Sequence, residues 1–111
     1  MPTIMDTRER AMEDKYTHDL SADFKLISKR NRLYGLWIAQ NLNLVEHEAE
    51  SYARALVNFN LKCPGDEAMI EKTRQDLEKK GAKTYSLHQL QKKLSHCMED
   101  AREQMAAESR A

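Results

Sequence analysis

The chain has 111 residues, of which 41% are hydrophobic, 32% are charged and 6% are aromatic. This length suits one domain with a single modest core. Eighteen basic residues balance eighteen acidic ones, so no net field draws the whole protein to nucleic acid or to an anionic membrane. With only three glycines and two prolines, the composition favours helices over a sheet.

The apolar patterning and the cysteines predict the cellular location of the protein. The longest unbroken apolar run, Leu36 to Ala39, is far shorter than the roughly 20 residues that cross a bilayer. The N-terminus lacks a basic flank followed by an apolar stretch, so no secretory signal is visible. Cys63 and Cys97 stand alone in the sequence, which suits reduced thiols in the cytosol and leaves a disulfide between them open. We therefore expect a cytoplasmic protein that is not itself a membrane protein.

The first predicted element, from Met5 to about Leu20, is dense in charge. Met12, Tyr16 and Leu20 recur every four positions and make only a thin apolar stripe. An isolated helix of this length is marginal in water. Residues 1–20 are therefore predicted to form a separate N-terminal segment that is mobile or marginally helical in the free protein.

A stronger helical pattern runs from about Ser21 to Asn41, with Ser21 as the expected N-cap. Gly35 within this helix predicts close approach of a neighbouring helix. Trp37 is expected at the centre of the core, because its side chain can bury on the order of 150 to 250 Å². The residues spaced to line the inner face of this helix are Phe24, Ile27, Tyr34, Trp37 and Ile38.

Three further helices are predicted from capping signals and apolar spacing. Asn43 and Glu46 resemble a capping box, with Ala49, Tyr52, Ala53, Leu56 and Val57 facing inward after it. Asp66 is the expected N-cap of a helix that buries Met69, Ile70, Thr73 and Leu77 and ends at Gly81. Ser86 and Gln89 form another capping box before Leu87, Leu90, Leu94, Cys97, Met98, Ala101 and Met105. The fold class is therefore all-α, with a small four-helix bundle over residues 21–111.

The sequence carries no signature of catalysis. It has no glycine-rich phosphate loop, nucleophile elbow or closely spaced set of metal ligands. Adjacent His96 and Cys97 would point about 100° apart on a helix, which does not favour a shared metal ion. His47 lies among glutamates and is interpreted as a solvated residue rather than a general base. We expect neither an enzyme nor a metal site.

One basic cluster has two interpretations. It consists of Lys25, Lys29, Arg30 and Arg32. Lys25, Lys29 and Arg32 occupy positions i, i+4 and i+7 of one helical face, where they could hold a phosphate group or an acidic partner surface. A solvated helix face is the alternative, since acidic residues lie beside the cluster. Nucleic-acid binding is not predicted, because no exposed aromatic residues are interleaved with the basic ones.

Several motifs together resemble a known family. They are Thr-Arg-Glu-Arg-Ala-Met-Glu-Asp-Lys-Tyr-Thr-His-Asp at residues 7–19, Phe24-Lys25, and Lys-Arg-Asn-Arg-Leu-Tyr-Gly-Leu-Trp at residues 29–37. Looser matches follow at residues 49–53, 65–67 and 101–104. The chain is similar to the zeta subunit family of alphaproteobacterial F1-ATPase inhibitors. It departs from the family pattern at Met12, Tyr16, Leu20-Ser21 and Asp23, and these changes bear on inhibitory strength rather than on fold.

The resemblance implies a reversible protein inhibitor of ATP hydrolysis by F1Fo-ATP synthase. Its partner would be the F1 sector, at an interface between catalytic and non-catalytic subunits and with the central stalk as a further contact, on the cytoplasmic face of the inner membrane. We hypothesise that Met12, Tyr16 and Leu20 are apolar anchors of an inserted helix. The expected polar contacts around them are Arg8, Glu9, Arg10, Glu13 and Lys15.

Two alternatives stay open at this point. One is an adenine-nucleotide-sensing module in which Lys25, Lys29, Arg30 or Arg32 binds the phosphates of ADP or ATP weakly, alongside inhibition or instead of it. No other cofactor is expected. The second alternative is a helical scaffold without an ATPase partner, in which the N-terminus is an ordinary solvated tail.

Overall fold

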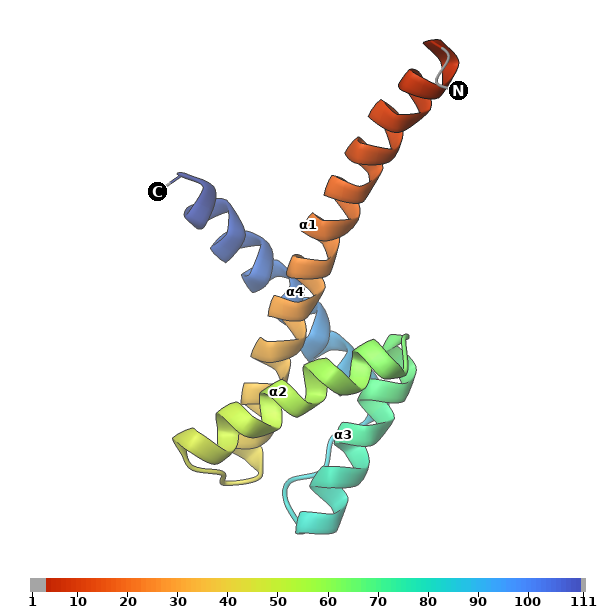
Figure 1. The fold of residues 1–111 in the computed structure, drawn as a ribbon. Helices are drawn as coiled ribbons and strands as arrows, with labels where there is room; N and C mark the ends of the chain where they lie inside the picture. Colours follow the sequence, from red (N-terminus) through yellow and green to blue (C-terminus); the bar gives the residue numbers. More distant parts are fainter. Residues whose placement is uncertain (1–3, 111) are drawn as a thin grey trace.

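The computed structural model describes the backbone of residues 4–110 and the side chains of residues 23–109. It contains four helices, α1 (Ile4–Asn41), α2 (Glu46–Lys62), α3 (Asp66–Lys80) and α4 (Leu87–Arg110), and the backbone over residues 4–110 forms no strand. The predicted all-α, four-helix fold is confirmed (Figure 1). None of the helices over this range is both long and apolar enough to span a membrane.

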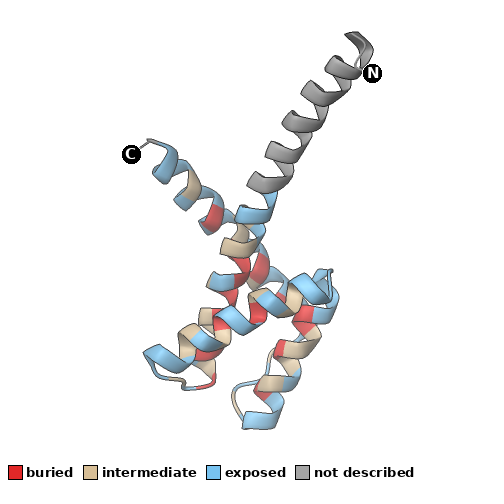
Figure 2. Ribbon diagram, in the orientation of Figure 1, coloured by how far each residue is buried: buried red, intermediate tan, exposed pale blue. Residues whose placement is uncertain are grey.

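Helix α1 is the element on which the others assemble. Helices α2 and α4 pack against it, and α3 contacts α2, α4 and α1 (Figure 1). Helix α4 crosses α1, and beyond the crossing the C-terminal half of α4 and the N-terminal half of α1 diverge. Figure 2 shows the buried residues gathered where the helices meet. The bundle therefore covers the C-terminal part of α1, and the first buried side chain described along this helix is that of Arg30.

The helix that was expected to begin at Ser21 begins instead at Ile4. No glycine or proline lies between Pro2 and Gly35, so no residue type that breaks a helix interrupts this stretch. The predicted N-cap at Ser21 is therefore wrong. The division into a mobile segment of residues 1–20 and a bundle of residues 21–111 concerns mobility, and it stays a prediction.

The core differs from expectation along α1. Tyr34 and Ile38 are fully buried, whereas Trp37 is only partly buried at the edge of the core. Phe24 is 52% exposed and Ile27 is 37% exposed. The spacing of these residues predicted a helix correctly, but their burial depends on how far α2 and α4 extend along α1. The other core residues are Leu42, Leu56, Met69, Ile70, Leu77, Leu90, Leu94 and Cys97.

Two predicted N-caps are also wrong, and both residues have other roles. Asn43 has φ 60° and ends α1 in a Schellman arrangement, in which the Leu44 N–H donates to the Ala39 carbonyl at 3.0 Å. Helix α2 is capped by Val45 without a side-chain hydrogen bond. Gly65 precedes α3 in the capping position, which leaves the Asp66 carboxylate to bond elsewhere.

The expected C-terminal end of α3 and the expected start of α4 are confirmed. Gly81 has φ 68°, in the left-handed region that favours glycine. The Ala82 N–H behind it donates to the Leu77 carbonyl at 3.0 Å and closes α3. At the start of α4, the Gln89 N–H donates to Ser86 Oγ at 3.1 Å and the Ser86 N–H donates to Gln89 Oε1 at 2.9 Å. These reciprocal bonds form the predicted capping box, although Leu87 just after it is exposed rather than buried.

Candidate functional site

The residues predicted to contact a partner lie at the N-terminal end of α1. They are Arg8, Glu9, Arg10, Met12, Glu13, Lys15, Tyr16 and Leu20, and their side chains lie outside the described residues. Their backbone belongs to the same helix as the core residues Tyr34 and Ile38. The structure therefore connects the predicted segment to the bundle without an intervening loop.

Exposed apolar side chains continue the spacing of this predicted segment into the bundle. Met12, Tyr16, Leu20 and Phe24 follow one another at intervals of four residues, and Ile27 follows Phe24 at an interval of three. Phe24 and Ile27 are exposed, so they are available to a partner rather than committed to the core. Sequence reasoning assigned both to the core, although the four-residue spacing also places Phe24 in line with the predicted apolar stripe of Met12, Tyr16 and Leu20.

The basic cluster of α1 is divided between two sides of the helix. Arg30 is buried, and its guanidinium binds the Asp66 carboxylate of α3 through two hydrogen bonds of 2.8 and 3.3 Å. Its Nε atom donates to Asn31 Oδ1 at 2.9 Å. This arrangement anchors α1 to the start of α3. Arg30 therefore does not share a surface with the other three residues of the cluster.

Lys25, Lys29 and Arg32, which the spacing predicted to share one helical face, line one groove. The groove has a volume of about 580 Å³ and lies between α1, α2 and the C-terminal part of α4. Lys29 pairs with Glu108 of α4, and Arg32 pairs with Glu50 of α2 at 2.7 Å. Phe24, Val57, Met105 and Arg54 also line it. Apolar side chains and cationic groups thus occur side by side in this groove.

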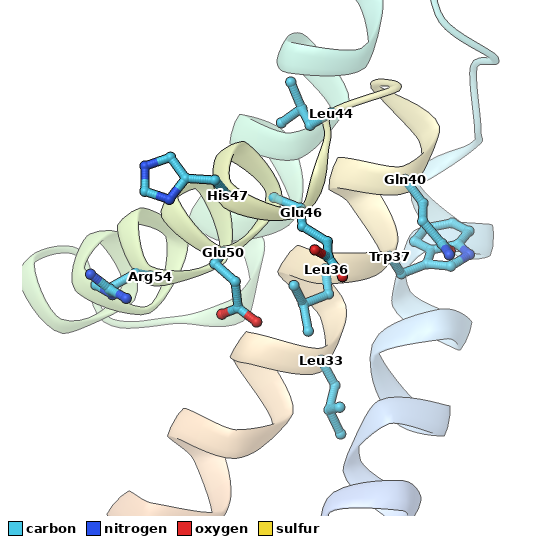
Figure 3. A pocket seen from close by; sticks show the side chains of 10 residues that line it. Leu33, Leu36, Trp37, Gln40, Leu44, Glu46, His47, Glu50 and Arg54 are labelled. Atoms are coloured by element: carbon cyan, nitrogen blue, oxygen red, sulfur yellow. The ribbon is translucent and has the colours of Figure 1, made fainter.

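A larger hollow of about 850 Å³ lies between α1 and α2 (Figure 3). Leu33, Leu36 and Trp37 of α1 supply its apolar side. Most of its polar side comes from α2, and in Figure 3 the His47 ring and the Glu50 carboxylate point in different directions. His47 is exposed, as expected for a solvated helix-face residue.

The titratable groups with shifted pKa values belong to the packing between helices. Burial raises the pKa of Tyr34 to about 12, and Tyr34 Oη lies 2.9 Å from Thr73 Oγ1 of α3. Burial and a 2.7 Å hydrogen bond to Asp76 raise the pKa of Tyr52. Burial also raises the pKa of the Cys97 thiol. In each case a neutral group is stabilised inside the bundle, which is a structural role.

Neither cysteine forms a disulfide. Cys63 is exposed after the end of α2, and Cys97 is buried on α4. Within the described part of the chain, no group of three or more histidine, cysteine, aspartate or glutamate side chains is arranged to hold a metal ion.

The match to a family of known proteins identifies the chain. The family model of ATPase inhibitor subunit zeta matches residues 1–104. The chain belongs to the ATPase inhibitor subunit zeta family. The matched region includes the predicted N-terminal segment, helices α1 to α3 and most of α4, so a zeta subunit comprises the segment and the bundle together. No curated protein and no solved structure gives a significant match to the chain.

Membership in the zeta family establishes the general role of the protein. The family consists of inhibitor subunits of an ATPase, so the partner of this zeta subunit is an ATPase. The two parts of the molecule that could act on it are the N-terminal part of α1, which extends from the bundle, and the surfaces of the bundle itself.

Proposed function

We propose that this zeta subunit reversibly inhibits ATP hydrolysis by the F1 sector of F1Fo-ATP synthase, by inserting residues 1–20 between a catalytic and a non-catalytic subunit. The observation that carries the proposal is the unbroken course of α1 from Ile4 to Asn41. A catalytic interface must open and close in each turnover, so a helix bound to one of its states stops the cycle without any chemistry of its own.

Continuity of α1 defines the geometry of insertion. At 1.5 Å per residue, the helix from Ile4 to Leu20 is roughly 24 Å long. Side chains of α2 and α4 face α1 from the groove at Phe24 and Lys25 onward, and the bundle is much wider than a single helix. The N-terminal part of α1 can therefore enter a cleft, while the bundle stays outside and limits the depth of insertion.

The apolar stripe supplies the binding energy in this proposal. Met12, Tyr16 and Leu20 are the expected anchors, and burial of each large apolar side chain is worth roughly 1.5 to 3 kcal/mol. Methionine and tyrosine both suit an apolar groove, because methionine is adaptable and tyrosine has a large ring. Exposed Phe24 and Ile27 extend the stripe to the rim of the cleft. Arg8, Glu9, Arg10, Glu13 and Lys15 would form the surrounding polar contacts.

Reversibility follows from the marginal helicity expected for residues 1–20 in the free protein. Ordering such a segment on binding opposes association by about 2 to 5 kcal/mol. A modest net affinity allows the subunit to dissociate when the state of the enzyme changes.

Deletion of residues 2–18 tests the proposal. The truncated chain keeps every described core residue, so we expect it to remain helical by circular dichroism but to lose inhibition of ATP hydrolysis by cognate F1. A full-length triple variant, Met12→Ala, Tyr16→Ala and Leu20→Ala, should weaken inhibition similarly. Equal inhibition by the truncated and intact proteins would exclude insertion of this segment as the mechanism.

A second candidate function is weak binding of ADP or ATP in the groove of Lys25, Lys29 and Arg32. These cations and the apolar side chains of Phe24 and Met105 line the same groove. The cations suit the phosphates of a nucleotide, and the apolar side chains suit its adenine ring. Arg30 faces Asp66 instead and is not included. Titration of the isotopically labelled protein with ADP should shift the amide signals around Lys29. Unchanged signals at millimolar ADP would rule this function out.

A further inference from the structure

Positive charge is concentrated in one stretch of this otherwise neutral chain. Residues 79–98 contain two histidines and five lysines but no aspartate or glutamate. The lysines are Lys79, Lys80, Lys83, Lys92 and Lys93. The balance of eighteen basic and eighteen acidic residues therefore conceals a strongly basic region at the end of α3, the loop after it and the first half of α4.

The lysines of the 79–98 stretch lack acidic partners, whereas five other cations of the bundle have one. Lys29, Arg30, Arg32, Lys72 and Arg74 each pair with a carboxylate. Over residues 23–109, no carboxylate lies within ion-pair distance of any lysine of the 79–98 stretch. Their charges are therefore not neutralised within the bundle, and they favour an acidic partner.

Two of the lysines lie over aromatic rings that meet where the loop before α4 contacts α1. The rings of Trp37 and Tyr85 have centroids 5.0 Å apart. Lys93 Nζ lies 5.2 Å from the Trp37 ring centroid, and Lys83 Nζ lies 5.3 Å from that of Tyr85, within the range of cation–π attraction. The Tyr85 hydroxyl donates to Asn41 Oδ1 at 2.9 Å. The two rings are thus packed together, with an ammonium group over each, in the free protein.

This cluster borders a hollow, which we call the lysine groove. It has a volume of about 400 Å³ and is lined by Trp37, Tyr85, Gln89, Lys92, Lys93 and His96. Every lining side chain is aromatic, amide or basic. A partner segment could place carboxylates beside the ammonium groups and apolar carbons against the rings, a combination typical of the central residues of protein interfaces.

We propose that the lysine groove binds an acidic peptide segment of the ATPase that this protein inhibits. The inference rests on the proposed function for the identity of the enzyme. Charge complementarity and the aromatic floor favour a protein segment over a membrane, because the rings lie below the lysine ammonium groups rather than projecting as anchors.

The position of the lysine groove on the bundle suits a second contact with the enzyme, separate from insertion of the N-terminal segment. Trp37 lies 17 residues beyond Leu20 on the same helix, which corresponds to about 25 Å. An acidic segment bound there would hold the bundle against the enzyme while the N-terminal part of α1 enters the cleft. Two linked contacts of this kind raise the overall affinity, because the second forms within the same complex.

Binding to purified cognate F1 tests the proposal with the full-length protein. We expect Lys92→Gln with Lys93→Gln to raise the Kd about tenfold at low ionic strength, with unchanged inhibition at saturation. The matched control is Lys62→Gln with Arg102→Gln, which removes the same charge at exposed positions outside the groove and should change the Kd less than twofold. Equal Kd values for the two double variants would overturn the lysine groove as a docking surface. Absence of inhibition by the wild-type protein would instead refute the proposed function.

Trp37 is the only tryptophan of the chain and gives a direct signal from the groove. A synthetic peptide of alternating glutamate and leucine should shift its fluorescence in the wild-type protein and in the Lys62→Gln, Arg102→Gln control. It should cause no shift in the Lys92→Gln, Lys93→Gln variant. A shift caused by vesicles of 30% anionic phospholipid but not by the peptide would overturn the proposal and assign the groove to a membrane surface.

Discussion

Gly35 of α1 lies directly against Ala53 of α2. A Cβ atom on Gly35 would lie 2.8 Å from the Ala53 Cα atom and 3.2 Å from its Cβ atom. Because the nearest atom belongs to the backbone, it cannot rotate away as the end of a side chain could. The close approach of these two helices depends on the absence of a side chain at residue 35.

Replacement of Gly35 by alanine is expected to destabilise the protein, although alanine is the better helix former by about 1 kcal/mol. Overpacking against the α2 backbone typically costs about 1 to 3 kcal/mol, so the free energy of unfolding should fall by a net amount of up to about 2 kcal/mol. Urea denaturation measures the change. Gln40→Ala, at an exposed position of the same helix, should stay within about 0.5 kcal/mol of wild type. A more stable Gly35→Ala variant would contradict the predicted overlap.

The ion pairs of α1 should differ in their contributions to stability. The side chain of Arg30 is 8% exposed and that of Asp66 is 53% exposed, whereas Arg32 and Glu50 are 50% and 46% exposed. Asp66→Ala leaves a buried guanidinium without its carboxylate and should cost about 1 to 3 kcal/mol. Glu50→Ala removes a solvated pair and should cost less than about 1 kcal/mol. Thermal and urea unfolding of both variants would reveal the difference, and similar losses would argue against it.

Tyr34 makes stability depend on alkaline pH. The Thr73 hydroxyl donates to the Ile70 carbonyl at 2.8 Å, so the Tyr34 hydroxyl is the donor toward Thr73. Burial raises the pKa of Tyr34 from 10.0 to about 12. The unfolded chain therefore loses this proton at a lower pH than the folded protein, and stability that is fully present below pH 10 is lost as the pH rises toward 12.

The variant Tyr34→Phe isolates this effect. Near neutral pH it should be less stable than wild type by about 1 kcal/mol, through loss of the hydrogen bond. Between pH 10 and about 12 the wild-type protein should lose this advantage, since only the wild-type protein has a phenol at residue 34. Guanidinium denaturation at several pH values measures the difference. A constant difference across this range would show that Tyr34 titrates normally in the folded protein.

The two thiols are predicted to react at very different rates. Cys63 is exposed, whereas Cys97 is buried and its pKa is raised by that burial. A disulfide-exchange reagent at pH 8 should modify Cys63 rapidly. It should modify Cys97 roughly a hundredfold more slowly or only after unfolding, because reaction requires opening of the core. Cys63→Ser should abolish the rapid phase, and two equal rapid phases would show that Cys97 is accessible.

Local patterns in the sequence predicted the elements that depend on near neighbours. The capping box of Ser86 and Gln89, the end of α3 at Gly81 and the apolar spacing of α4 involve residues a few positions apart. Such interactions are formed within one or two helical turns. The zeta family was likewise predicted from short motifs in the first forty residues and is confirmed by the family match.

The tertiary structure decided which face of each helix is buried by its neighbours, and over what length of the helix. Phe24 and Trp37 follow the same apolar spacing as Tyr34, but α2 and α4 bury only Tyr34 completely. Arg30 was indistinguishable from Lys29 in a run of basic residues, until α3 placed Asp66 beside it. Lys83 and Lys93 lie around one aromatic pair because the loop before α4 places Tyr85 against the Trp37 ring. In each case the deciding partner is distant in sequence, and local periodicity carries no information about where such a partner packs.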